Sequence, residues 1–251
     1  MVWMVSFSTA QVTIQPRQMD YSYSGVLYNS EKTFLAALHT NGVNFGYRNG
    51  SIRKYYLTNY TDIDIGTLKH PKEYNQNIRT QSVLHNISSA GAFTYGKQNS
   101  FFTIRAGLGA KRYFSEKARR KGVSVALTYE GGPSLGILKP YYLDLRKFNG
   151  DRYYIQSVRY SEKTAGDFLD INNIVSSSSA FKGFGEISLV PGLQGKSSVN
   201  FSFGDSDEYV KSIEAGLMID VFPRSIPIMI NTPNSNFFIN FFLQFEFGKR
   251  K

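Results

Sequence analysis

Residues 237–248 read FFINFFLQFEFG, and apolar and polar positions alternate along them. One face of this segment is wholly apolar and consists of Phe237, Ile239, Phe241, Leu243, Phe245 and Phe247. The opposite face carries Asn240, Gln244, Glu246 and Gly248, together with two further phenylalanines. Successive side chains of a β-strand point to opposite sides, so the segment predicts a strand with one apolar and one largely polar face.

The same alternation returns in earlier parts of the chain. It is clear in residues 213–221, 102–110 and 123–138, and weaker in residues 55–66. Repeated strands that are apolar on one side and polar on the other are typical of a membrane β-barrel, whose outer face contacts lipid and whose inner face lines the lumen. The sequence therefore predicts an all-β protein, a closed antiparallel transmembrane β-barrel of about eight strands.

Three segments depart from a simple alternation. Residues 33–48 predict one irregular strand, in which a break near Asn41-Gly42 would restore the phase. Residues 187–193 and 198–203 predict a hairpin that turns around Gly195-Lys196-Ser197. Gly131-Gly132-Pro133 predicts a bend or bulge.

Two connections between the predicted strands are long, at residues 68–100 and 142–180. With both chain ends in the periplasm, the predicted strand order places both connections on the periplasmic side as well. Within the second, residues 165–175 carry apolar side chains near helical spacing, which predicts a short helix against the barrel mouth. We expect both connections to contact other envelope proteins.

Composition excludes several classes of protein. The chain has 251 residues and a mean hydropathy of −0.29, and it contains no uninterrupted apolar run of about 18 residues such as a membrane-spanning helix needs. Residues 31–251 are expected to form a single barrel domain. The chain has no cysteine, which excludes disulfides, thiol catalysis, cysteine metal sites and a lipid-anchored N-terminal cysteine.

The formal net charge is +10, which indicates an anionic partner. The basic residues lie mainly in predicted turns such as residues 116–121 and at the C-terminus, with no nucleic-acid-binding motif near them. We therefore expect contact with outer-membrane lipid and lipopolysaccharide, and no nucleic-acid partner.

The first ten residues resemble the end of a signal peptide. A short apolar run at residues 2–7 is followed by Ser8-Thr9-Ala10, a small-residue pattern that predicts cleavage after Ala10, although the usual basic start is missing. Residues 11–30 would then form an N-terminal extension. Residues 1–10 could alternatively belong to a first strand. Export would place the protein in the outer membrane of a Gram-negative cell.

The polar face of the predicted strands carries charges of both signs. They are Asp62, Asp64, Arg105, Lys111, Glu130, Glu186, Glu214, Asp220 and Glu246. The lumen of an eight-stranded barrel is just wide enough for side chains, so these charges are expected to pair with one another and close the pore. The alternative use of the same carboxylates, as an acid–base pair for hydrolysis of lipid or peptide, is favoured by no spacing in the sequence.

The three histidines, His39, His70 and His85, have no metal-ligand spacing. His39 lies in a predicted strand and could support a serine nucleophile, as in barrel lipid-A deacylases, but the sequence indicates no matching serine and acid. His70 precedes Pro71 in a predicted turn. We therefore expect no catalytic residue, no metal and no cofactor.

Several stretches resemble a family of exported barrels. They are His39-Thr40-Asn41-Gly42, Leu68-Lys69-His70-Pro71-Lys72-Glu73, Tyr95-Gly96-Lys97, Gly132-Pro133-Ser134-Leu135-Gly136-Ile137-Leu138-Lys139-Pro140 and Phe247-Gly248-Lys249. In these stretches the chain is similar to the PorT-type small outer-membrane barrels of Bacteroidota. That resemblance implies a role in the type 9 secretion apparatus, and it supplies no catalytic residues.

The sequence thus predicts a non-enzymatic outer-membrane barrel that acts as a structural or accessory component of protein secretion or outer-membrane assembly. One alternative is a barrel enzyme that hydrolyses lipid or peptide. Others are a narrow channel, a ligand-binding barrel, or a soluble barrel that would need no detergent.

Overall fold

The structure is a computed structural model that describes residues 28–76, 91–115, 122–204 and 208–251. The predicted signal peptide (1–10), most of the predicted extension (11–30), His85 and the basic segment 116–121 lie outside the described residues. Strand β1 begins at Ser30, close to the predicted start of the barrel domain at residue 31.

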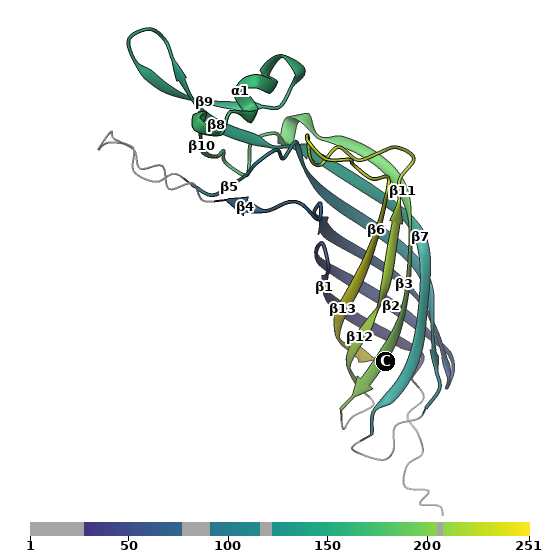
Figure 1. The fold of residues 1–251 in the computed structure, drawn as a ribbon. Helices are drawn as coiled ribbons and strands as arrows, with labels where there is room; N and C mark the ends of the chain where they lie inside the picture. Colours follow the sequence, from purple (N-terminus) through teal and green to yellow (C-terminus); the bar gives the residue numbers. More distant parts are fainter. Residues whose placement is uncertain (1–27, 77–90, 116–121, 205–207) are drawn as a thin grey trace, which may run out of the picture.

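Eight strands close into a barrel (Figure 1). They are β1 (Ser30–His39), β2 (Gly42–Lys54), β3 (Leu57–Leu68), β6 (Asn99–Tyr113), β7 (Ser124–Pro140), β11 (Ser188–Phe203), β12 (Tyr209–Val221) and β13 (Phe237–Arg250). Around the ring their order is β1-β13-β12-β11-β7-β6-β3-β2, and every neighbouring pair is antiparallel. The prediction of a closed antiparallel barrel of eight strands is confirmed.

The segment predicted as one irregular strand, residues 33–48, is two strands. β1 and β2 form a hairpin whose last pair is His39 with Gly42, and the chain turns at Thr40 and Asn41. The break in alternation at Asn41-Gly42 is therefore a hairpin turn, and the prediction of a single strand is wrong.

The hairpin predicted around residues 195–197 is, in contrast, one continuous strand. β11 pairs with β7 from Ser188 and with β12 from Leu193, and Gly195 lies opposite Gly131 on one side and Ile219 on the other. The Gly-Lys-Ser sequence suggested a turn, but the two neighbouring strands hold this segment extended. The Gly-Gly-Pro stretch of β7 contains no bulge, because its register with β6 is the same before and after two unpaired positions.

One predicted strand is two strands, and two predicted strands are one, so the total of eight is unchanged. The long connections nevertheless lie at the opposite end of the barrel from the one predicted. β1 begins and β13 ends at the same end of the barrel, where Glu31 pairs with Arg250. Both long connections lie at the opposite end (Figure 1). Their predicted position, at the same end as the chain termini, is wrong because an additional strand precedes each of them.

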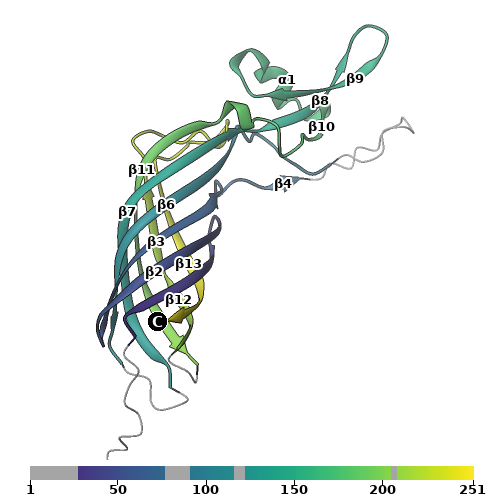
Figure 2. The same ribbon diagram turned by 180° about the vertical axis from the view of Figure 1, so that it is seen from behind.

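The two long connections fold together into a structured unit, which we call the end module (Figure 2). Its elements are β4 (Asn75–Gln76), β5 (Phe93–Thr94), β8 (Tyr142–Phe148), β9 (Tyr153–Arg159), η1 (Glu162–Thr164), α1 (Ala165–Leu169), η2 (Ile171–Asn173) and β10 (Ile174–Ser177). Its main sheet has the order β10-β8-β9. The predicted helix at residues 165–175 is present but ends at Leu169, and the chain then continues into η2 and β10.

The end module has its own hydrophobic core. Phe168 of α1 is fully buried against Leu143 and Leu145 of β8, and Phe93 joins them from the first long connection. The backbone N–H of Ser177 in β10 donates to the carbonyl of Ala92, so the two connections also share hydrogen bonds. Burial of these large side chains makes the end module a defined structure.

The same end of the barrel is closed by apolar side chains. The connection between β12 and β13 crosses the mouth, where the backbone N–H of Gln98 donates to the carbonyl of Ile228 and that of Ile230 to the carbonyl of Gly96. Apolar side chains of this connection pack with others from the barrel strands in the mouth plug, which we define as Leu68, Phe101, Leu138, Val190, Phe222, Ile226, Ile228, Met229 and Phe238. A last 3₁₀ turn, η3 (Phe184–Glu186), precedes β11.

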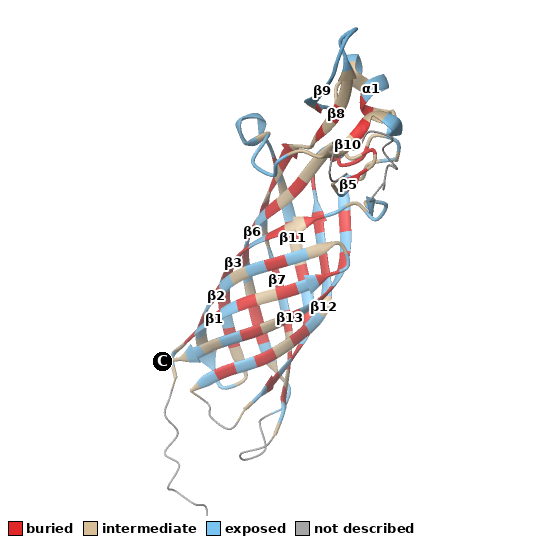
Figure 3. Ribbon diagram, turned by 90° about the vertical axis from the view of Figure 1, so that its left-hand side faces the viewer, coloured by how far each residue is buried: buried red, intermediate tan, exposed pale blue. Residues whose placement is uncertain are grey.

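Burial alternates along the barrel strands, as Figure 3 shows. Inward side chains are buried and largely polar, whereas many outward side chains are exposed and apolar. This arrangement is the reverse of that in soluble proteins, which keep charged side chains at the surface. No helix among the described residues is long and apolar enough to cross a membrane.

The end module's core predicts a local effect of mutation. Phe168→Ala removes the central ring and should destabilise the end module by about 3–5 kcal/mol, the usual range for such a truncation, while leaving the barrel folded. Limited proteolysis in detergent should then cut within residues 142–180, and the barrel should remain intact by circular dichroism. Phe148→Ala, which changes an exposed ring, is the control and should behave like the unmodified protein. Loss of the barrel in Phe168→Ala would contradict the prediction that the effect is confined to the end module.

Candidate functional site

Eight of the nine charged residues that the sequence assigned to the lumen are buried inside the barrel. They are Asp62, Asp64, Arg105, Lys111, Glu130, Glu214, Asp220 and Glu246. The assignment of Glu186 is wrong, because this residue ends η3 outside the barrel and pairs there with Arg159. Residue 186 precedes the first residue of β11, so the alternation of that strand does not apply to it.

Three further buried lumen charges, Glu31, Arg48 and Lys196, were missed, as was the partly buried Arg250 that pairs with Glu31. Arg48 lies in the segment mistaken for a single strand, and Lys196 in the supposed hairpin turn. Glu31 lies at the first residues of β1, before the strand predicted to begin at residue 33. Strict alternation would have identified Lys196, because Gln194, Lys196 and Ser198 all face the lumen.

The upper part of the lumen, next to the mouth plug, is organised by Arg105. Its guanidinium binds Asp220 through two hydrogen bonds, Nε to Oδ1 at 2.7 Å and Nη2 to Oδ2 at 2.9 Å. Nη1 donates to Oδ1 of Asp64 at 3.0 Å. Such a two-pronged contact is the strongest geometry between arginine and a carboxylate. Asp64 also pairs with the ammonium of Lys196, which lies 3.1 Å from Oε1 of Glu130.

The lower part of the lumen is organised by Arg48 and Lys111. Arg48 pairs with Glu246, lies 3.2 Å from Glu214, and stacks over the Tyr60 ring at 4.0 Å. The ammonium of Lys111 lies 2.9 Å from Oε2 of Glu246 and 3.5 Å from Oε1 of Glu31. Arg48 also reaches Glu130 at 3.6 Å, which joins the lower group to the upper one.

The ion pairs form one continuous series of alternating sign, which we call the ion chain. It runs through Asp220, Arg105, Asp64, Lys196, Glu130, Arg48, Glu246, Lys111, Glu31 and Arg250. Asp62 and Glu214 are attached to it at the sides through Arg48. Every one of the eight barrel strands contributes at least one of these residues. The ion chain therefore fills the lumen and ties all the strands together.

Neutral polar groups extend this network. Asn200 Nδ2 and Ser212 Oγ donate to Oε2 of Glu246 at 3.0 and 2.6 Å. Gln244 Nε2 donates to Glu214 at 2.9 Å, and Gln194 Nε2 to Glu130 at 2.9 Å. Buried charges are tolerated when they are both paired and hydrogen-bonded in this way.

A glycine makes room for the carboxylates at the centre of the ion chain. A Cβ placed on Gly107 would lie 2.5 Å from Oδ1 of Asp62 and 2.5 Å from Oε1 of Glu130. Any larger residue at this position would displace one of the two carboxylates. The Gly107-Leu108-Gly109 stretch therefore relieves crowding inside the barrel.

Among the described residues, the ring nitrogens of His39 contact an amide side chain and a backbone N–H. Its Nε2 lies 3.2 Å from the side-chain amide of Asn44, and its Nδ1 accepts a hydrogen bond from the backbone N–H of Asn41 at 3.3 Å. A serine hydrolase would need a hydroxyl and a carboxylate at these two nitrogens. Among the described residues, no group of three or more His, Asp or Glu side chains is placed to hold a metal ion.

The outer wall is apolar on every side of the barrel. Phe237, Ile239, Phe241, Leu243 and Phe247, which the sequence assigned to the lipid face, are exposed on the outside, and Phe245 on the same face is half-buried. Exposed apolar residues on the other strands include Phe34, Phe45, Ile63, Leu108, Tyr129, Leu193 and Ile219. A soluble monomer rarely exposes an apolar surface of this extent.

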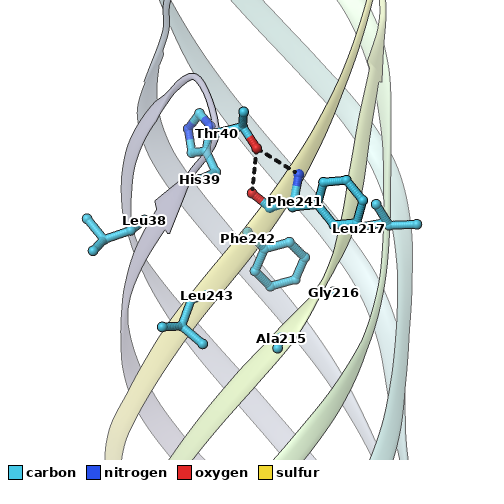
Figure 4. A pocket seen from close by; sticks show the side chains of 9 residues that line it. All are labelled: Leu38, His39, Thr40, Ala215, Gly216, Leu217, Phe241, Phe242 and Leu243. Carbon is cyan, nitrogen blue, oxygen red and sulfur yellow. Dashed lines mark hydrogen bonds between the residues drawn. The ribbon is translucent and has the colours of Figure 1, made fainter.

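A hollow of about 620 Å³ lies in this outer wall (Figure 4). Small residues of β12, Ala215 and Gly216, lie between the larger side chains of Leu38, Phe241 and Leu243. Thr40 Oγ1 interacts with the backbone N–H and carbonyl of Phe241 at 3.3 and 3.4 Å, so this hydroxyl has partners. The hollow is largely apolar and offers no arrangement for acid–base chemistry.

Fold and lumen together define a closed eight-stranded β-barrel whose interior is filled by ion pairs and an apolar plug. No family model and no curated protein matches the chain, so the predicted resemblance to PorT-type barrels has no support from either comparison.

Solved structures with a similar arrangement include Neisserial surface protein A (NspA), with 9% identity and a TM-score of 0.41 over 88% of this chain and 96% of that one. Ail of Yersinia pestis has 7% identity and a TM-score of 0.36 over 88% and 95% of the two chains. The N-terminal β-barrel domain of Pseudomonas aeruginosa OprF has 8% identity and a TM-score of 0.34 over 88% and 98%. These values assign no function to the chain.

The ion chain predicts which lumen substitutions the barrel tolerates. Arg105→Met leaves Asp220 buried without its partner and should lower the free energy of unfolding by about 3–5 kcal/mol. The double variant Arg105→Met/Asp220→Leu should be more stable than the single variant, because Asp64 keeps its pair with Lys196. Urea unfolding in lipid vesicles would measure both values.

Arg112→Met is the control, because Arg112 is an exposed residue on the same strand. It should change the free energy of unfolding by no more than about 0.5 kcal/mol. If the single and double variants were equally stable, the pairing of Arg105 with Asp220 would make no contribution to the free energy of unfolding.

Proposed function

We propose that the protein is an integral outer-membrane β-barrel without enzymatic activity. In this proposal it serves as a structural or accessory component of protein secretion or outer-membrane assembly. Its barrel anchors the end module in the membrane, and the end module binds a partner protein. The observation that carries the proposal is the combination of a filled lumen with two long connections folded into a single unit with its own core.

The apolar outer wall supports the membrane location. Phe241, for example, is 71% exposed on the outer wall. In lipid this surface would be buried in hydrocarbon, where each apolar side chain is stable. The ring of eight paired strands leaves no strand edge open around the barrel, as a membrane requires.

Connection lengths support an orientation. In bacterial outer-membrane barrels the short turns face the periplasm and the longer loops face outward. Here β2 and β3 are joined by only Tyr55 and Tyr56, at the end that carries the chain termini. The end module lies at the other end, so we propose that it faces the cell exterior.

The tip of the β8–β9 hairpin supports a docking role. Phe148, Tyr153, Tyr154 and Ile155 are all exposed there, although they are apolar or aromatic. Aromatic residues are enriched in protein–protein interfaces. β9 is also an edge strand of its sheet, since no described strand pairs with its other side. A free edge with exposed aromatic residues is a suitable surface for a partner polypeptide.

The alternatives receive less support. A channel needs an open path, but the ion chain and the mouth plug occupy the lumen. An enzyme needs a nucleophile or acid–base pair with access to substrate, whereas the carboxylates of the lumen are buried in ion pairs. The outer hollow contributes only Thr40 and His39 as polar residues.

Affinity purification from detergent-solubilised outer membranes of the native host tests the proposal. The tagged protein should recover secretion or assembly proteins in a fixed ratio. The triple variant Tyr153→Ser/Tyr154→Ser/Ile155→Ser should lose them, because it removes the exposed apolar surface of β9. Phe181→Ser/Phe184→Ser removes two exposed rings elsewhere at the same end and is the matched control. Recovery of the barrel alone, with no specific protein, would argue against an accessory role.

Labelling of single cysteines tests the orientation, since the chain has no cysteine of its own. A membrane-impermeant maleimide should modify Asp151→Cys, in the β8–β9 turn, on intact cells. It should modify Arg53→Cys, next to the β2–β3 turn, only after the outer membrane is permeabilised. The reverse pattern would put the end module in the periplasm.

A further inference from the structure

A short segment beside the end module, residues 180–188, combines exposed aromatic and basic side chains. We call it the rim segment, because it joins the end module to the top of β11 at the edge of the barrel. Phe181 is 83% exposed, and Phe184 and Ile187 are also exposed. The exposed residues Leu189 and Leu193 continue this apolar surface down the outside of β11. The rim segment therefore lies at the upper limit of the apolar wall.

The rim segment is held in a defined conformation. Gly183 has a φ of +87°, and a Cβ at this position would lie 2.9 Å from the carbonyl oxygen of Pro140. The ammonium of Lys139 donates to the carbonyl of Ala180 and lies 4.9 Å from the centre of the Phe184 ring. The hydroxyl of Tyr142 donates to Glu186 at 2.9 Å. These contacts attach the segment to the corner between β7 and β8.

Basic side chains from two other parts of the chain, Arg159 and Arg224, also meet the rim segment. Arg159 of β9 pairs with Glu186, and Lys182 donates to the hydroxyl of Ser157, two residues before Arg159 on the same strand. Residues two apart share one face of a strand, so the hydroxyl that Lys182 contacts and the side chain of Arg159 lie on the same face of β9. Arg224 donates to the hydroxyl of Ser188 at 3.4 Å.

The local charge is positive. Lys139, Arg159, Lys182 and Arg224 are four cations, and the nearby carboxylates are Glu186 and Asp144, the latter bound by Ser157. Lys182 and Arg224 contact neutral hydroxyl groups and are exposed, so their charges are available to an anion.

We propose that the rim segment, with Arg159, Lys182 and Arg224, binds the phosphorylated headgroup of an outer-leaflet lipid. The phosphate contacts the cations, and the lipid's acyl chains lie against Phe181, Ile187 and the wall below. Aromatic residues at the headgroup level with basic residues beside them are the usual arrangement at a membrane interface. This inference rests on the membrane location proposed above and adds to it a specific ligand class.

A lipid fits this surface better than free phosphate does. Free phosphate would use the cations alone and leave Phe181 and Phe184 exposed to water. The continuity of these rings with Leu189 and Leu193 matches a molecule that carries a phosphate and an acyl chain together.

Native mass spectrometry of the full chain in detergent tests the proposal. The probes are dioleoyl phosphatidic acid, dioleoyl phosphatidylcholine and inorganic phosphate at matched concentrations. We expect phosphatidic acid to bind at least several-fold more tightly than phosphatidylcholine, and inorganic phosphate not to be retained. Lys182→Gln/Arg224→Gln should weaken phosphatidic acid binding roughly tenfold, because each basic residue near an anionic headgroup adds to the attraction.

Two further variants separate this site from general charge effects. Lys147→Gln/Arg152→Gln removes the same charge from the β8–β9 hairpin and should bind phosphatidic acid like the unmodified protein. Glu186→Gln removes the opposing carboxylate and should strengthen binding several-fold. Equal affinity of the Lys182/Arg224 variant and the unmodified protein would overturn the proposal, as would retention of inorganic phosphate in place of lipid. A protein that stays soluble without detergent would instead refute the membrane location itself.

Discussion

The ion chain in the lumen is the constraint on which the barrel depends. Arg105 and Arg48 each bind carboxylates from several strands, and Lys196 joins the two groups through Asp64 and Glu130. A charge buried inside the barrel is stable only while it is paired, so the position of each strand is fixed by the partners of its inward charges. A shift of one residue in any strand would turn those charges outward and apolar side chains inward. The polar interior therefore specifies the register as strictly as a hydrophobic core does in a soluble protein.

A filled interior moves the functional surfaces to the outside and the ends. The ion chain occupies the lumen, and the outer wall is apolar. What remains available is the end module, with the free edge of β9, and the rim segment beside it. Both lie at the end opposite the chain termini because the long connections follow β3 and β7, which run toward that end.

The alternation seen in residues 237–248 and repeated in earlier segments predicted the barrel and most of the ion chain, because each strand obeys a period of two. The strand count was correct because two errors cancelled. The sequence failed where local residue preference conflicts with tertiary pairing. Gly195-Lys196-Ser197 resembles a turn, yet two neighbouring strands hold it extended, and Lys196 thereby enters the lumen. At Asn41-Gly42 a hairpin turn between two strands was interpreted as a break in the alternation of a single strand. The end module was not predictable because its core joins residues from both long connections, such as Phe93 and Phe168.

The end module and the barrel mouth are packed against each other through the β12–β13 connection. Ile226, Ile228 and Met229 of the β12–β13 connection fill the mouth plug, while Ile230 of the same connection packs against the end module's core. The rim segment adds a second attachment, because Lys139 at the end of β7 binds Ala180 and Tyr142 of β8 binds Glu186. A partner bound to β9 would therefore be held at a fixed position relative to the membrane rather than on a loose tether. A binding surface that is already held rigidly loses less conformational entropy when a partner binds. An anchoring barrel with a closed lumen can hold such a surface.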